Sequence, residues 1–185
     1  MQSHYFLAVP LPKSLKQKLN ETIIKKKPFT FNRWVHEEDL HLTLVFLGAC
    51  TVKQLEQIKM RMDSLLSNWT SFSLELSTLG TFGTKERPRI FWIGVKNQPR
   101  LVSLQQEIFA QCEKIGFSLD KRAFSPHITL ARKWIGQREY HANMEKKIKA
   151  DDQWDVKEII LYKSVLTEEP KYKVEKSFQF GGVSR

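Results

Sequence analysis

The sequence predicts an α+β fold with two pseudo-symmetric lobes, whose antiparallel sheets surround a central cleft and whose helices lie on the outside. Strand-like and helix-like stretches alternate along the 185 residues, with hairpin-like strand pairs as well as crossovers. The tetrapeptide HLTL at position 41 returns as HITL at position 127, close to half a chain later. No stretch rich in Gly, Ser or Pro separates a second unit, so we expect residues 1–185 to form a single bilobal domain.

The strand-like segments are short apolar runs or alternate between apolar and polar residues. In chain order, they lie at residues 5–9, 41–47, 72–82, 89–95, 125–132, 154–166 and 172–180. The helical segments instead carry apolar residues at intervals of three and four, as an amphipathic helix does. They lie at residues 14–27, 51–69 and 99–115.

Local signals set the ends of these segments. Pro28 stops the first helix, Thr51 is the expected N-cap of the second, and Gly116 ends the third. The segments between the elements are expected to be a loop at 33–40, turns at 84–88 and 167–171, and a short polar helix or a loop at 137–149.

Composition narrows the class of protein and of partner. The formal net charge is +10, which favours anionic partners such as RNA or DNA. No apolar run approaches the roughly 20 residues that span a membrane. The N-terminus lacks the pattern of a signal peptide, and Cys50 and Cys112 are far apart. We therefore expect a cytoplasmic protein without a disulfide scaffold or a structural zinc site.

The repeated tetrapeptide places the same polar pair on two strands. Successive side chains of a strand point to opposite faces, so His41 shares a face with Thr43, and His127 shares a face with Thr129. Burying such groups without partners costs on the order of 1–3 kcal/mol each. Building the pair twice therefore indicates a shared polar cleft.

Two histidines and two hydroxyls in one cleft suit the opening of a cyclic phosphodiester. That reaction needs a base to activate water and an acid to protonate the departing oxygen, and histidine titrates near neutral pH. The two threonines are placed to donate to the phosphate oxygens. Arg132 adds a positive charge for the phosphate, although simple alternation points it away from the cleft unless the strand bends.

The other histidines and the acidic residues are expected to be less important. His36 stands beside residues 37–39, an acidic run that we interpret as a solvated loop face. Neither HxT pair has a carboxylate or a second histidine one helical turn away, as zinc sites usually have. We therefore expect no catalytic metal and no cofactor.

With these residues in view, the sequence resembles the two-histidine (2H) phosphoesterase superfamily, and within it the RNA 2′,3′-cyclic phosphodiesterases, also called 2′-5′ RNA ligases or LigT-like proteins. The doubled HxTx pattern is the specific part of this resemblance. Nearly the whole chain contributes the remainder, in the segments FLAVPLP (6–12), LHLTLVFLG (40–48), PRIFWIGV (88–95), RAFSPHITLAR (122–132) and LYKSVL (161–166), with Tyr172 ahead of the last strand.

The resemblance implies residue roles. It makes His41 the proton donor to the 3′ oxygen and His127 the proton acceptor from water. It implies metal-independent hydrolysis of an RNA 2′,3′-cyclic phosphate to a 2′-phosphomonoester, with Thr43, Thr129 and Arg132 binding the phosphate. A self-contained cleft makes a monomer the expected state.

Three alternatives stay open from the sequence. The same residues would serve a 2′-5′ RNA ligase or 2′-5′ phosphodiesterase, and also a phosphodiesterase for small cyclic nucleotides. A non-catalytic RNA-binding module is disfavoured because both HxTx motifs are intact.

Overall fold

The computed structural model describes residues 3–141 and 152–182, and its main feature is a nine-stranded sheet. Its order is β7-β4-β5-β6-β3-β1-β8-β9, with β2 also paired to β6. All pairings between the named strands of the described residues are antiparallel. The predicted α+β class with antiparallel sheets is confirmed.

The elements have the following bounds. The strands are β1 His4–Pro10, β2 Phe31–Trp34, β3 His41–Ala49, β4 Phe72–Gly83, β5 Pro88–Val95, β6 His127–Trp134, β7 Gln153–Val156, β8 Glu158–Ser164 and β9 Tyr172–Gln179. The α-helices are α1 Lys13–Leu19, α2 Val52–Leu66 and α3 Pro99–Ile115. A π-helical turn, Asn20–Ile24, continues α1, and a short 3₁₀ helix, Glu37–Asp39, precedes β3.

The sheet consists of two four-stranded runs that meet at β3 and β6. One run is β3-β1-β8-β9 and the other is β6-β5-β4-β7, so each begins with a strand that carries an HxT sequence. A single pair of Cα partners, Leu42 and Ile128, joins β3 to β6. This narrow junction sets the two polar pairs side by side.

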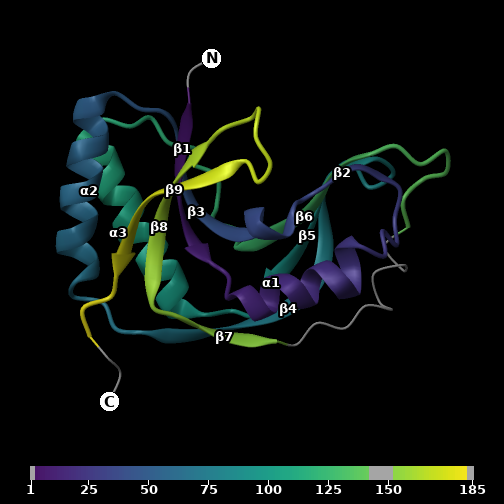
Figure 1. The fold of residues 1–185 in the computed structure, drawn as a ribbon, viewed down its shortest axis with the longest axis horizontal. Coiled ribbons are helices and arrows are strands. Elements are labelled where there is room, and N and C mark those ends of the chain that lie inside the picture. The colour runs from purple at the N-terminus through teal and green to yellow at the C-terminus, as the bar shows by residue number, and fades with distance from the viewer. Residues whose placement is uncertain (1–2, 142–151, 183–185) are drawn as a thin grey trace.

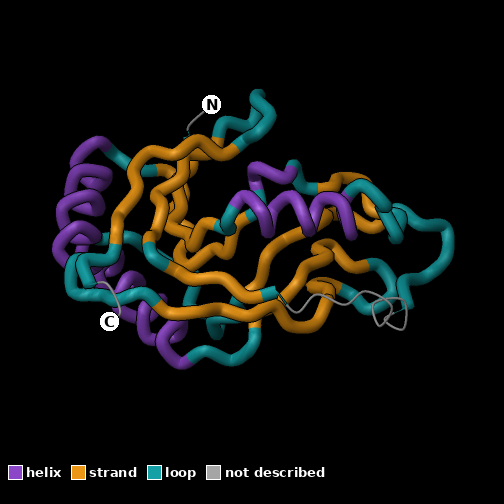
Figure 2. The backbone as a smooth tube through the Cα atoms, turned by 60° about the horizontal axis from the view of Figure 1, so that its bottom comes forward, coloured by secondary structure: helices purple, strands orange, loops and turns teal. Residues whose placement is uncertain are grey.

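The helices lie outside the strands and cover opposite ends of the molecule. Helix α2 packs against α3 and β9, and α3 also packs against β3. Figure 1 shows α2 and α3 together at the end that holds β8 and β9, and α1 at the end that holds β4, β5 and β6. Figure 2, turned by 60°, keeps the same separation.

The apolar side chains form one large core and one small separate cluster. The large core includes Leu42 and Ile128, both fully buried, so the junction between the two runs is itself a core contact. The small cluster consists of Phe6, Ala8, Ile160 and Tyr162, which lie on the other face of β1 and β8. Tyr172 packs against this cluster. The cluster forms part of the surroundings of His41.

Two of the predicted helix ends are confirmed, the N-cap of α2 at Thr51 and the end of α3 at Gly116. The Thr51 hydroxyl accepts from the Gln54 backbone N–H and the Gln54 side chain accepts from the Thr51 backbone N–H, which makes a capping box at α2. Gly116 ends α3 with φ of +98°, a left-handed conformation that favours glycine. Helix α2 itself is shorter than predicted and ends at Leu66.

Three predicted segments differ from the structure. The expected strand 154–166 is two strands, because β7 pairs with β4 in one run whereas β8 pairs with β1 and β9 in the other. The first residues of the expected loop 33–40 belong to β2. This strand has only four residues, which are too few to show the alternation of apolar and polar side chains typical of a strand. The expected helix 14–27 consists of α1 followed by a π-helical turn, and it ends at Ile24 rather than at residue 27. The prediction for 137–149 lies mostly outside the described residues.

Candidate active site

The strands β3 and β6 bring the two predicted polar pairs together. Because Leu42 and Ile128 are antiparallel partners, position 41 lies opposite 129 and position 43 lies opposite 127. His41, Thr43, His127 and Thr129 are each half-buried, whereas Leu42 and Ile128 between them are buried. Two imidazoles and two hydroxyls therefore converge from the two halves of the sheet.

The His41 ring is held in one tautomer by its neighbours. Its Nδ1 lies 2.7 Å from the backbone oxygen of Asp39, and a carbonyl oxygen only accepts, so Nδ1 carries a hydrogen. Its Nε2 lies 3.0 Å from the Thr43 hydroxyl, which donates to it when the ring is neutral. The rings of Phe6 and Tyr172 flank the imidazole, with centroids at 4.7 and 5.1 Å.

The His127 ring is held by the same local device. Its Nδ1 lies 2.7 Å from the backbone oxygen of Ser125, again two residues earlier. Phe82 packs edge-on against the ring at 4.8 Å, and Trp92 lies at 6.2 Å. In both histidines Nδ1 is thus occupied and Nε2 is the atom available for proton transfer.

Both imidazoles are neutral at neutral pH in the free protein. Burial lowers the pKa of His41 to about 4, against an opposing contribution from Asp39, and the charge of Arg132 lowers it further. Burial also lowers the pKa of His127, with Arg132 again adding to the effect. The charge of Arg132 therefore acts on both rings.

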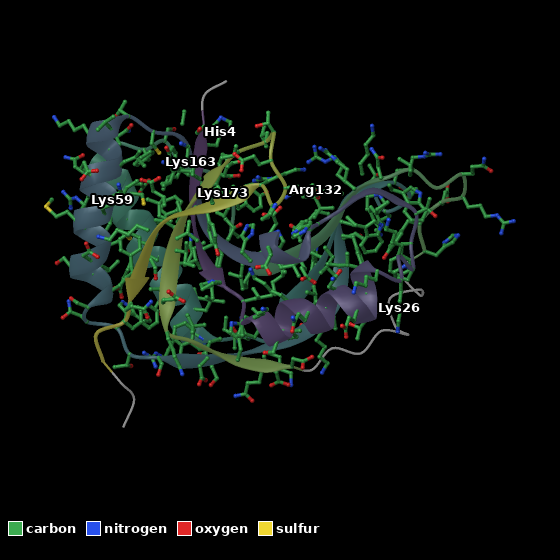
Figure 3. The ribbon with its side chains drawn as sticks, in the orientation of Figure 1. His4, Lys26, Lys59, Arg132, Lys163 and Lys173 are labelled. Carbon is green, nitrogen blue, oxygen red and sulfur yellow. The ribbon has the colours of Figure 1, made fainter. Side chains whose placement is uncertain are left out.

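Arg132 reaches the cleft because β6 contains a bulge. Phe91 pairs with Ala131 and Trp92 pairs with Thr129, so Leu130 has no partner on β5. Leu130 and Ala131 are both fully buried, and the alternation restarts with Arg132 half-exposed on the side of Thr129. The strand irregularity on which the predicted role of Arg132 depended is present. Figure 3 shows Arg132 next to the turn between β8 and β9.

The strand β3 contains the matching bulge at Leu44, which has no partner on β1. Phe46 therefore occupies on β3 the place that Arg132 occupies on β6, three residues after the threonine. Its ring is 57% exposed, whereas Phe91 is fully buried in the core. Phe46 is thus an aromatic surface at the mouth of the cleft.

Asp39 is a functional candidate that the sequence did not reveal. Residues 37–39 were expected to be solvated, but Asp39 is 4% exposed. Its two carboxylate oxygens accept from the backbone N–H groups of Lys171 and Tyr172, both at 3.0 Å. Because its backbone oxygen also holds His41, Asp39 ties the β8–β9 turn to the histidine. The burial of this carboxylate depends on partners about 130 residues away, so a local pattern cannot show it.

Tyr172 closes the cleft on the β9 side. Burial raises the pKa of its hydroxyl, whereas the charge of the neighbouring Arg132 acts in the opposite direction. Tyr172, Arg132 and Asp39 line a cavity of about 290 Å³ together with residues of β2 and of the β8–β9 turn. The two halves of the sheet are therefore bridged by side chains at this cavity.

The described residues offer no obvious metal site and no membrane span. Within ranges 3–141 and 152–182, no three His, Cys, Asp or Glu side chains gather as metal ligands would. None of the helices in these ranges combines the length and the apolar character that crossing a bilayer requires.

Comparison with known proteins identifies relatives of this chain. Residues 12–167 match the family model of the 2′-5′ RNA ligase superfamily. A protein of Geobacillus stearothermophilus named RNA 2′,3′-cyclic phosphodiesterase is 39% identical over 183 residues, which cover 98% of this chain and 58% of that protein. The chain thus spans little more than half of that relative's length. A protein of Thermotoga maritima with the same name is 33% identical, over 96% of this chain and 95% of its own length.

A solved structure shares the fold. The crystal structure of E. coli LigT complexed with 3′-AMP superposes with a TM-score of 0.80, covering 98% of this chain and all of that one at 24% identity. The likeness extends over both halves of the sheet.

Proposed function

The chain belongs to the 2′-5′ RNA ligase superfamily, and from that premise we propose that it hydrolyses 2′,3′-cyclic phosphates at RNA ends to 2′-phosphomonoesters. The observation that carries this proposal is the pair of imidazoles at the β3–β6 junction. Each has its Nδ1 committed to the carbonyl two residues earlier, so Nε2 is the proton-transferring atom of each ring, and in His41 it contacts the Thr43 hydroxyl. The names of the Geobacillus and Thermotoga relatives support the same reaction.

The proposed reaction is an in-line displacement at phosphorus. The neutral His127 accepts a proton from water at Nε2 while the water oxygen bonds to phosphorus. The bond between phosphorus and O3′ breaks on the opposite side, and His41 protonates O3′ from Nε2. The products are a 2′-phosphate and a 3′-hydroxyl. Each proton transfer is worth roughly 10²–10⁴ in rate.

His41 must gain a proton before it can donate one. Its pKa of about 4 in the free protein disfavours the imidazolium. A cyclic phosphodiester carries a negative charge, and a negative charge beside a histidine raises its pKa. Substrate binding therefore favours the protonated form of His41 in the complex.

Three side chains are proposed to hold the phosphate. Thr43 and Thr129 face the cleft from the two strands, so their hydroxyls are placed to donate to the non-bridging oxygens. The Arg132 guanidinium offers a planar pair of donors and a fixed charge for the electron density that builds up on the phosphoryl oxygens. Tyr172 lies beside it in the same cavity.

The terminal nucleobase is proposed to stack on Phe46. This ring is exposed at the cleft mouth, and His4 packs edge-on against it with centroids at 5.8 Å. Stacking of a base on an aromatic ring is worth about 1–3 kcal/mol and tolerates any base. The enzyme would then accept RNA ends of different sequence.

The test is product analysis. An RNA ending in a 2′,3′-cyclic phosphate is incubated with the protein, and the position of the product phosphate is determined by phosphorus NMR. We expect a 2′-phosphate. A 3′-phosphate would reverse the assignment of the leaving oxygen, and an unchanged cyclic phosphate with folded protein would refute the reaction.

A second activity, formation of a 2′-5′ bond, is favoured by the superfamily to which the chain belongs. An RNA 5′-hydroxyl would replace water, lose its proton to His127 and attack the same phosphorus, with O3′ again leaving. The same assay with an added 5′-hydroxyl RNA detects the joined product by its length.

We further propose that residues 1–185 act as one bilobal, monomeric domain in the cytoplasm. The single β3–β6 junction and the crossing from β7 to β8 support one domain, because each run of strands needs the other. Two free thiols, at Cys50 and Cys112, suit a reducing compartment. Light scattering after size-exclusion chromatography tests the monomer.

A further inference from the structure

We propose that a groove of cations beside the cleft binds the phosphodiesters of the RNA strand that precede its cyclic end. The inference rests on the proposed function and specifies the substrate as a polynucleotide. The groove has a volume of about 420 Å³, and its lining includes Arg33 of β2, Arg87 just before β5, Arg89 of β5, and Arg132 and Lys133 of β6. We call these five residues the cation groove.

The charges of the cation groove oppose one another across the strands. Arg33 and Arg132 are antiparallel Cα partners, so their side chains leave the sheet on the same face and next to each other. Like charges directly opposite across a strand pair are destabilising. An anion between them would remove this repulsion.

No carboxylate neutralises the cation groove within the described ranges. The ion pairs of the described residues involve cations outside the groove, for example Lys59 with Glu175 and Lys176 with Asp63. Arg33, Arg87 and Arg89 are moreover exposed. A guanidinium that is exposed and not paired with a carboxylate can bind a phosphate in bidentate fashion.

The cation groove adjoins the cavity that Asp39 and Tyr172 line beside His41, because Arg33 and Arg132 line both cavities. The RNA strand can continue only from the 5′ oxygen of its terminal nucleotide, because its 3′ end carries the cyclic phosphate. The next phosphodiester must therefore leave the cleft, and the neighbouring strands β6, β2 and β5 offer it the cations of the groove. RNA is the expected polyanion, because a 2′,3′-cyclic phosphate requires a ribose.

The test compares two substrates that share the same terminal nucleoside. One is a nucleoside 2′,3′-cyclic phosphate, which has no upstream phosphodiester, and the other is an oligoribonucleotide with the same cyclic end. The groove variant is Arg87→Gln with Arg89→Gln, two exposed residues that do not line the cavity with Tyr172. The control is Lys53→Gln with Lys114→Gln, which removes the same charge from exposed positions on α2 and α3.

The expected result is a loss confined to the oligoribonucleotide. In the groove variant, kcat/KM for the oligoribonucleotide falls about tenfold or more. The slope of log kcat/KM against log salt concentration also becomes shallower, by about 0.7 for each phosphate that the protein no longer neutralises. The nucleoside cyclic phosphate keeps its kcat/KM within about twofold. The control variant retains the wild-type values for both substrates.

Two kinetic outcomes would overturn the inference. One is an unchanged kcat/KM for the oligoribonucleotide in the groove variant, and the other is an equal loss of kcat/KM on both substrates.

If the wild-type protein turns over no cyclic phosphate at all, the proposed function fails, and the inference is tested by RNA binding instead. Fluorescence anisotropy of a labelled single-stranded RNA should then show weaker binding to the groove variant but not to the control. Equal affinities, or complete displacement of the RNA by inorganic phosphate at equal concentration, would refute a strand-binding groove.

Discussion

At the scale of single residues, the site depends on how each imidazole is fixed. His41 and His127 each place Nδ1 at 2.7 Å from a backbone oxygen two residues earlier. A backbone oxygen does not change with pH or mutation, so the tautomer is set by the chain itself. The two rings differ in their surroundings, since only the His41 Nε2 also contacts a threonine hydroxyl.

The lowered pKa of His41 predicts a loss of stability in acid. The unfolded chain takes up a proton near pH 6.5, whereas folded His41 takes it up only near pH 4. The unfolded state therefore binds more protons between these values, and the free energy of unfolding falls as pH drops, by about 1.4 kcal/mol per unit. Urea unfolding across this window should show a shallower pH dependence in His41→Gln. Parallel pH curves for the two proteins would contradict the burial of a neutral imidazole.

Asp39 is predicted to be a positioning residue. In Asp39→Asn the side chain keeps one acceptor oxygen for the two backbone donors of Lys171 and Tyr172. We expect the free energy of unfolding to fall by about 1–3 kcal/mol. We also expect turnover to fall, because Tyr172 loses its place against His41. The control Glu38→Gln removes the same charge from the neighbouring, exposed side chain. Equal stability of the two variants would refute this role.

At the scale of elements, the two matched bulges matter most. Leu44 in β3 and Leu130 in β6 each lack a partner on the neighbouring strand. Each bulge turns the third residue after the threonine back toward the cleft, which brings in Phe46 on one side and Arg132 on the other. Strict alternation, which the sequence supports, predicts the opposite side for Arg132. A bulge follows from pairing with β1 or β5, and pairing partners are not visible in a single strand.

The capping box of α2 gives an element-scale prediction. Thr51→Ala removes the hydroxyl that accepts from the Gln54 N–H and should cost about 1 kcal/mol of stability. The site is remote from the cleft, so turnover should not change. Ser64→Ala, at an exposed position of the same helix, is the control and should be neutral or slightly stabilising. Thermal unfolding measures both, and an unchanged Thr51→Ala transition would contradict the cap.

The local sequence pattern was sufficient to predict the bounds of some elements but not of others. The long amphipathic helix α3 was predicted with the bounds that the structure has, because its spacing, Pro99 and Gly116 all agree. The break at Lys157 was missed, since residues on both sides of it favour strands. The strand is interrupted there only because the pairing partner changes from β4 for β7 to β1 for β8.

At the scale of the whole molecule, the cleft exists because two distant parts of one chain fold against each other. The strand runs that contain His41 and His127 meet at the single pair Leu42 and Ile128. The sequence predicted this meeting from the repeated HxT pattern alone. It could not predict the burial of Asp39, or that the residues of the cation groove line one cavity, because both depend on neighbours from other strands and turns.

Metal independence is a prediction for the whole protein. If the proton transfers are carried by the two imidazoles, turnover of a 2′,3′-cyclic phosphate should be unchanged in excess EDTA. Incubation with and without the chelator measures this directly. A complete loss that zinc or magnesium restores would contradict the two-histidine account.

The most direct test of that account is turnover by the single variants His41→Ala and His127→Ala on an RNA with a 2′,3′-cyclic phosphate end. Unfolding transitions recorded in parallel establish that each variant is folded. We predict that each variant loses at least about 10² in kcat, because each removes one proton transfer. A folded variant of either kind with near-wild-type kcat would contradict the acid–base assignment.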